Sequence, residues 1–365
     1  MAEPLASGHM NPFYDPLLSY EDNYAQGPFG VFADDVAIER PHTPEESFLG
    51  HPVHRAFGIP AGPLLNAKFC AAAFRHGYDI NAYKTVRSAA YPCHPFPNTL
   101  AVHVEGALTL DRASRPVVAD AEFTDVSSIT NSFGVPSRDP DEWQPDMSVT
   151  VRSAGTGQLL IGSFQGTRPG EGASDREAAF VADHVRTAAL VAETGARVLE
   201  MNLSCPNEGA ANLLCFDTPM VVKIVSAVKD EIGDLPLLLK LAYFPDDVLL
   251  ERLVAATEGI VQGYAAVNTI PAMLVDNHGA QALPGEGRAV GGVCGSAIAW
   301  AGLEMTTRLA RLRDQGNHGF AIVGVGGVWN VGDYFALREA GADAVMSATG
   351  AMFAPGLGMQ VQSLG

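Results

Sequence analysis

Eight short apolar segments recur along the chain, and most of them are followed by a segment with helical periodicity. They are Arg55–Ala61, Asn81–Val86, Leu159–Phe164, Ala196–Met201, Pro236–Leu241, Tyr264–Thr269, Phe320–Val323 and Asp343–Ser347. Short apolar runs alternating with helices indicate buried parallel strands. Eight consecutive units favour closure, so we predict an α/β fold of the (β/α)8 TIM barrel type, with a doubly wound sheet as the alternative.

Two regions are additional to a plain barrel. Residues 1–50 lack periodicity and are predicted to form an N-terminal arm, within which Ser7–Met10 is typical of a cloning scar. The segment 88–157 is predicted to be an insertion after the second strand, with a small antiparallel pair made by Ala101–Val104 and Ala107–Leu110. Residues 51–365 are otherwise expected to form one barrel domain, with a polar, glycine-rich loop at 274–296.

Composition excludes several classes of function. The net charge of -18 argues against nucleic-acid and anionic-membrane partners, which need basic surfaces. No run approaches the roughly 20 apolar residues of a membrane span. Five cysteines without a CxxC pair argue against disulfides, iron–sulfur clusters and structural zinc, and no metal site is predicted. The expected location is cytoplasmic.

The motif Asn202–Asn207 follows the fourth predicted strand and contains Cys205-Pro206. Proline cannot continue a strand, so the motif is predicted to be a loop at the carboxyl end of a barrel strand, where barrels carry their chemistry. A thiol between two amides suits proton transfer at a polar ring. The alternative is that Cys205 is a buried, inert side chain.

Glycines cluster after the last two predicted strands, in Gly324–Gly327 and Ala348–Gly350, and also at Gly291–Gly295. Barrels commonly bind phosphate there through backbone N–H groups, and the Thr349 hydroxyl is a further donor. The alternative is tight turns required by the topology alone. The spacing does not match a dinucleotide-binding fingerprint.

Two lysines and four asparagines are predicted to meet at the barrel mouth. Lys84 and Lys240 lie in apolar strands, where an ammonium is costly unless it meets an anion. The asparagines offer paired donors and acceptors to a ring that bears amide N–H and carbonyl groups. They are Asn131, Asn202, Asn207 and Asn268.

Together these motifs resemble the dihydroorotate dehydrogenase family, in particular its soluble class with a cysteine base. The resemblance covers residues 50–355 and rests on Asn202–Asn207, Tyr83–Val86, Asn131–Gly134, Gly326, Gly327 and Thr349. It implies FMN bound at Ala61, Lys84, Thr85, Asn202, Lys240, Val267, Gly295, Gly326, Gly327, Ala348 and Thr349. It implies a substrate site at Lys84, Asn131, Phe133, Gly134, Val135, Asn202, Asn207, Asn268 and Thr269. Cys205 is implied to be the general base.

The resemblance implies oxidation of dihydroorotate, a small anionic pyrimidine, to orotate in pyrimidine biosynthesis. Residues 291–298 also resemble the pyrimidine-reducing domain of dihydropyrimidine dehydrogenase, so another dihydropyrimidine-like ring is an alternative. A second alternative is a flavin-free lyase that forms a Schiff base on Lys84 or Lys240.

A homodimer is expected, with an electron-transfer partner subunit as one option for the electron acceptor.

Overall fold

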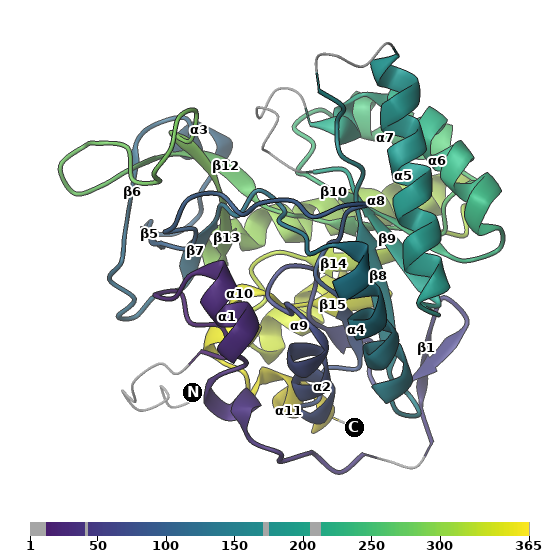
Figure 1. The fold of residues 1–365 in the computed structure, drawn as a ribbon, viewed down its shortest axis with the longest axis horizontal. Helices are drawn as coiled ribbons and strands as arrows, with labels where there is room; N and C mark the ends of the chain where they lie inside the picture. Colours follow the sequence, from purple (N-terminus) through teal and green to yellow (C-terminus); the bar gives the residue numbers. More distant parts are fainter. Residues whose placement is uncertain (1–11, 41–42, 171–174, 205–212, 365) are drawn as a thin grey trace.

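A computed structural model describes residues 12–40, 43–170, 175–204 and 213–364. Eight parallel strands form the central sheet in the order β3-β15-β14-β11-β10-β9-β8-β4. Figure 1 labels β8, β9, β10, β14 and β15 of this sheet. Their bounds are β3 Phe57–Gly58, β4 Ile80–Ala82, β8 Leu159–Phe164, β9 Val198–Asn202, β10 Leu237–Leu241, β11 Gly263–Ala266, β14 Ala321–Val325 and β15 Ala344–Met346. The predicted barrel is confirmed, and each strand overlaps the apolar segment that predicted it.

The barrel closes between its first two strands. The N–H groups of Asp79 and Ala82 donate to the carbonyls of Phe57 and Ile59, each at 2.9 Å. Gly58 permits this contact, because a Cβ at this position would lie 1.5 Å from the Ile80 carbonyl oxygen. Closure therefore depends on a residue without a side chain.

Helices cover the outside of the barrel. They are α2 Ala67–Arg75, α4 Pro140–Ser153, α5 Arg176–Glu193, α6 Thr218–Ile232, α7 Asp247–Thr257, α8 Ala299–Gly316, α9 Val331–Glu339, α10 Thr349–Phe353 and α11 Leu357–Gln362. Carboxylate caps fix where the two long helices beside β9 begin. The Asp175 side chain accepts from the Ala178 N–H at the start of α5, and the Asp217 side chain accepts from the Met220 N–H at the start of α6.

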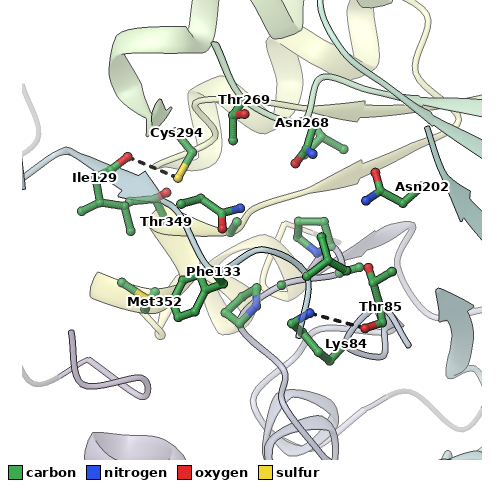
Figure 2. Close-up of a pocket in the computed structure, with 18 of the residues that line it drawn as sticks. Lys84, Thr85, Ile129, Phe133, Asn202, Asn268, Thr269, Cys294, Thr349 and Met352 are labelled. Atoms are coloured by element: carbon green, nitrogen blue, oxygen red, sulfur yellow. Dashed lines mark hydrogen bonds between the residues drawn. The ribbon is translucent and has the colours of Figure 1, made fainter. Parts of the chain in front are cut away.

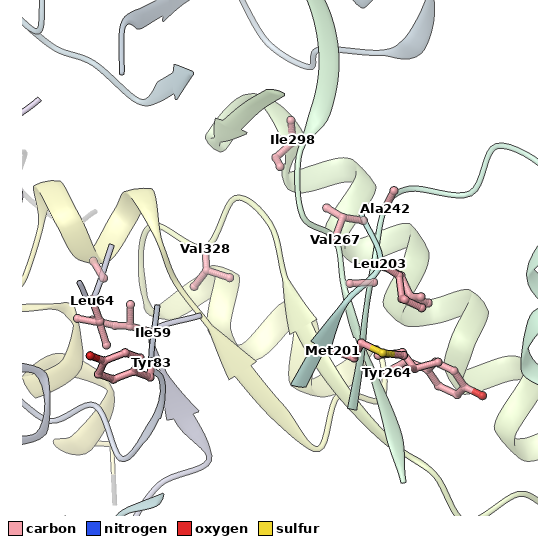
Figure 3. Packing of buried hydrophobic residues seen from close by; sticks show 14 of the residues in the cluster. Ile59, Leu64, Tyr83, Met201, Leu203, Ala242, Tyr264, Val267, Ile298 and Val328 are labelled. Atoms are coloured by element: carbon pink, nitrogen blue, oxygen red, sulfur yellow. The ribbon is translucent and has the colours of Figure 1, made fainter. Parts of the chain in front are cut away.

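Alternation along each strand divides the apolar core into two layers. The inward residues form a cluster inside the barrel that includes Ile161, Val198 and Leu238, and the hairpin β1 Glu46–Phe48 and β2 His51–Val53 adds its own apolar side chains to this cluster. The outward residues pack beneath the helices, where Figure 3 shows Met201, Leu203 and Tyr264. The barrel is therefore a filled core with its chemistry restricted to one end.

The predicted antiparallel insertion is present, but its strand pairing differs from the prediction. Five strands form a second, closed sheet in the order β12-β13-β7-β5-β6. Their bounds are β5 Ala101–His103, β6 Val117–Asp120, β7 Ser128–Asn131, β12 Ile270–Val275 and β13 Val290–Gly295. The predicted strand Ala107–Leu110 is wrong, because α3 Leu110–Ala113 begins there and β5 pairs with β6 instead. The predicted 274–296 loop contains the end of β12 and all of β13.

The described part of the arm packs against the barrel as α1 Tyr20–Gln26 and a short 3-10 helix, Gly30–Ala33. The β1–β2 hairpin lies across the predicted boundary at residue 50, and the division into arm and barrel stays a prediction. Among the described residues, no helix is long and apolar enough to cross a membrane, and no three His, Cys, Asp or Glu side chains group as metal ligands would.

Candidate active site

A cavity opens at the carboxyl ends of the barrel strands, between the barrel and the second sheet (Figure 2). Concave sites in this position of a barrel commonly take small organic ligands. Most of the predicted site residues line it, although they come from segments spread over most of the chain. They are Ala61, Lys84, Thr85, Asn131, Phe133, Val135, Asn202, Lys240, Val267, Asn268, Thr269, Ala348 and Thr349.

One side of the cavity, which we call the floor, is lined by Lys84, Thr85, Glu200, Asn202 and Lys240, with Ser163 bound to two of them. Strand alternation explains the floor, since Ser163, Glu200 and Lys240 each follow by two residues an inward apolar residue of the barrel core. Lys84 donates to the carbonyls of Thr85 and Pro136, both at 3.4 Å. Burial lowers the pKa of Lys240, and the nearby Glu200 carboxylate opposes that shift.

Asn202 holds the chain where β9 ends. Its Oδ1 accepts from the Ser204 N–H at 3.2 Å and from the Ser204 hydroxyl at 3.0 Å. The Asn268 amide donates to the Ser204 carbonyl at 3.2 Å. Two of the predicted asparagines therefore fix the residue that precedes Cys205. Cys205 and Asn207 themselves lie outside the described residues.

The opposite side, which we call the wall, consists of Tyr14, Tyr20, Ile129, Asn131, Phe133 and Cys294. Tyr14 and Tyr20 come from the arm and contact the Phe133 ring edge-on, with centroids 6.0 and 6.4 Å away. The Cys294 thiol donates to the Ile129 carbonyl at 3.5 Å, and burial raises its pKa to about 11. The wall is therefore mainly apolar and uncharged.

Residues 132–137 form a loop between the floor and the wall. Several carbonyl oxygens of this loop accept hydrogen bonds from residues outside it. Arg288 donates to the Ser132 carbonyl at 2.8 Å, the His94 N–H to that of Phe133 at 2.9 Å, and Arg87 to that of Val135 at 3.0 Å. Within the described ranges, no acceptor meets the backbone N–H groups of Phe133, Gly134 and Val135. The chain turns sharply here, with φ of 81° at Gly134 and 53° at Val135. Tight turns that leave successive N–H groups without acceptors make anion-binding concavities, or nests.

The predicted phosphate residues fall into two groups. Thr349 lines the cavity, and its buried hydroxyl makes no hydrogen bond of ordinary geometry within the described part of the chain, although it is near enough to the Cys294 thiol to lower the pKa of that group. The predicted phosphate glycines do not line the cavity; they are Gly295, Gly326 and Gly327. Gly134, predicted for the substrate site, does not line it either. Close packing explains two of the predicted phosphate glycines: a Cβ on Gly327 would lie 2.4 Å from Ala299, and one on Gly295 would lie 2.3 Å from the Ser127 carbonyl. Their role toward phosphate stays a prediction.

Several lining residues were not predicted, notably Glu200, Tyr14, Tyr20 and Cys294. The sequence could have indicated Glu200 as a site residue, because a carboxylate within the apolar segment 196–201 is as unusual as the ammonium of Lys240 within 236–241. Tyr14 and Tyr20 carry no comparable signal in an arm without periodicity.

A filled parallel barrel with lysines, asparagines and backbone donors at its mouth defines a barrel enzyme that acts on a small polar ligand. Comparison with known proteins identifies the family. The sequence model of the family described as dihydroorotate dehydrogenase matches residues 123–361. The chain belongs to this family, and it is an oxidoreductase of the kind that acts on CH–CH bonds.

Individual relatives agree with this assignment. A dihydroorotate dehydrogenase of Dictyostelium discoideum is 31% identical over 361 residues, covering 96% of both chains. The catalytic subunit of a dihydroorotate dehydrogenase B (NAD(+)) from Alkaliphilus oremlandii is 29% identical over 181 residues, covering 50% of this chain and 57% of that one. The Eimeria tenella enzyme, solved in complex with ferulenol, superposes with a TM-score of 0.65 over 87% of this chain and 82% of that one, at 17% identity, which shows a shared fold.

Proposed function

We propose that the protein oxidises dihydroorotate to orotate with FMN as its cofactor. The observation that carries this proposal is the nest of N–H groups at Phe133, Gly134 and Val135, of which Phe133 and Val135 line the cavity together with Lys84. Backbone donors together with an ammonium suit a carboxylate, which dihydroorotate bears and dihydrouracil lacks. The ring itself needs amide partners, which three lining asparagines supply: Asn131, Asn202 and Asn268.

The residues present fit FMN. The buried Thr349 hydroxyl is a donor suited to the phosphate, and Lys240, Asn202 and Lys84 supply polar contacts for the flavin ring. FMN, when bound, accepts a hydride from the substrate. The proposed cofactor contacts remain those predicted above, including the three glycines Gly295, Gly326 and Gly327.

Cys205 is proposed to remove the proton from the ring carbon next to the one that loses the hydride. Loss of both leaves the carbon–carbon double bond of orotate, with the proton on the sulfur. Asn202 and Asn268 anchor the preceding residue, Ser204, at the cavity. A thiolate is the reactive form, so the site must favour it, and Lys84 on the cavity floor is proposed as one source of positive charge.

Anaerobic mixing tests the proposal. Dihydroorotate should bleach the flavin absorbance rapidly, whereas dihydrouracil should leave it nearly unchanged. Faster bleaching by dihydrouracil would favour a different dihydropyrimidine as substrate. A colourless protein that binds no FMN would contradict the proposed cofactor and favour the Schiff-base lyase instead. A lysine with a lowered pKa, such as Lys240, is suited to forming a Schiff base.

The assembly and location of the protein are further proposals. A cytoplasmic homodimer is proposed, with a separate electron-transfer subunit as one route for the electrons that leave the flavin. Sedimentation of the purified chain measures its oligomeric state. Turnover assays with different acceptors, with and without cell extract, would reveal whether a partner subunit is needed.

A further inference from the structure

A layer of polar side chains rests on the apolar core of the barrel. Glu200 follows Val198 on the inward face of β9, and Ser163 of β8 lies directly opposite Glu200 in the strand register. On the other side, Lys240 of β10 is in register with Asn202, so it lies diagonally across from Glu200. Diagonal neighbours on one sheet face are close enough for charges to interact.

Hydrogen bonds fix the Glu200 carboxylate. The Thr85 and Ser163 hydroxyls are 3.0 Å apart, and Ser163 donates to Glu200 Oε1 at 3.2 Å. Glu200 is 1% exposed, and its Oε2 has no hydrogen-bond partner among the described residues. A buried carboxylate is costly unless a positive charge compensates it. The arrangement therefore calls for a nearby cation.

Lys240 is the cation on which this carboxylate acts. It is 4% exposed, and burial lowers the pKa of its ammonium while the Glu200 charge raises it. The other ionisable groups that line the described cavity are Lys84, which disfavours a second positive charge, and Tyr14, Tyr20 and Cys294. Burial raises the pKa of each of these last three, so they stay neutral near pH 8. Among the described residues that line the cavity, Glu200 is thus the carboxylate whose charge can offset the lowering of the Lys240 pKa by burial.

We propose that Glu200 is a positioning residue, held by Ser163, that keeps Lys240 protonated and its ammonium available at the floor of the cavity. The inference depends on the proposed function in one respect only, which is that FMN is the ligand that the Lys240 ammonium contacts. The effect of Glu200 on the charge of Lys240 is independent of any ligand.

Competitive labelling of the full-length protein with acetic anhydride, after removal of bound flavin, tests the inference. The rate at which Lys240 is acetylated, measured by peptide mass spectrometry against pH with exposed Lys68 as reference, gives the pKa of Lys240. In Glu200→Gln this pKa should fall by roughly one unit, as loss of a nearby opposite charge predicts. An unchanged profile would overturn the proposal. Glu231→Gln, which removes an exposed carboxylate on α6, is the matched control and should shift nothing.

Two further variants keep the test decisive if Glu200→Gln does not fold. Glu200→Asp retains the charge, so its Lys240 profile should stay close to that of the parent, and a fall of the Lys240 pKa by a full unit would overturn the proposal. Ser163→Ala keeps the carboxylate and removes the hydroxyl that fixes its position, so the Lys240 pKa should fall below that of the parent. No shift in Ser163→Ala would overturn the role given to Ser163.

FMN binding to the apoprotein provides a separate readout. Between pH 7 and 9 the dissociation constant of Glu200→Gln should rise relative to the parent by up to roughly tenfold, since one pKa unit corresponds to that factor. Equal pH dependence in both proteins would overturn the link to the ligand. If the parent itself bound no FMN, the proposed function would fail, while the labelling experiment would still decide the role of Glu200.

Discussion

The floor and the wall of the cavity differ in how they are built. The floor comes from neighbouring parallel strands, and its polar side chains lie at set intervals above the barrel core. The wall comes from the arm, the second sheet and the loop after β7, which lie far apart in the sequence. Floor residues are charged or hydrogen-bonded, whereas wall residues are mostly aromatic or apolar. We infer that the floor determines the chemistry and the wall determines the shape of the ligand.

The largest expected effect compares two cysteines. Cys205 follows floor strand β9 in the sequence, whereas Cys294 belongs to the wall. A positioned base contributes typically 10²- to 10⁴-fold in rate, so Cys205→Ala should slow flavin bleaching by dihydroorotate by roughly that factor while still binding orotate. Cys294→Ala should change the rate less than about threefold, because it supplies no base. Stopped-flow absorbance measures both, and equal effects would remove the distinction between floor and wall.

The second prediction concerns the barrel that supports the floor. In Gly58→Ala the new Cβ would meet the Ile80 carbonyl, so closure between β3 and β4 must be distorted. The free energy of unfolding should fall by about 3 kcal/mol. Gly319→Ala is the matched control, because nothing lies within 4 Å of its added Cβ. Urea denaturation followed by circular dichroism compares them, and an equally stable Gly58→Ala would contradict the described closure.

The third prediction removes a floor cation. Hydrogen bonds to charged groups contribute about 1.5–3 kcal/mol, so Lys84→Met should weaken orotate binding by roughly 10- to 150-fold. Lys223→Met, on the exposed face of α6, should leave binding unchanged. Isothermal titration of both variants measures this. Unaltered affinity in Lys84→Met would mean that the substrate carries no carboxylate near this residue.

The two regions also differ in how far the sequence predicts them. Lys84, Asn202 and Lys240 could be predicted because strand periodicity is local, and Glu200 was within reach of the same argument. Of the second sheet, the strand β5 was predicted, but its closure with β12 and β13 was missed because strand pairing is not local. The glycines of the segment 290–295 made β13 resemble a loop. A Cβ on Gly291 would collide with the side chains of Leu274 and Leu283, and one on Gly292 with that of Thr269.

The smallest expected effect tests the wall. Tyr20 contacts Phe133 edge-on, and such aromatic pairs contribute about 0.5–1.5 kcal/mol. Tyr20→Ala should therefore weaken orotate binding by roughly 2- to 12-fold, because the loop that carries the Phe133, Gly134 and Val135 N–H groups loses lateral support. The flavin should be retained, since the predicted cofactor contacts on the floor are unchanged. Isothermal titration with orotate and flavin absorbance measure the two properties.

Tyr20→Phe and Phe335→Ala are the controls for this last variant. Tyr20→Phe keeps the ring and removes only a hydroxyl, so it should bind orotate like the parent. Phe335→Ala removes an exposed aromatic ring on α9, outside the cavity, and should also leave binding unchanged.

The wall should affect selectivity more than rate: an orotate analogue with a ring substituent too large for the parent should bind better to Tyr20→Ala. If Tyr20→Ala instead slowed bleaching as strongly as Cys205→Ala, the arm would contribute to the chemistry itself, and the assignment of chemistry to the floor alone would be wrong.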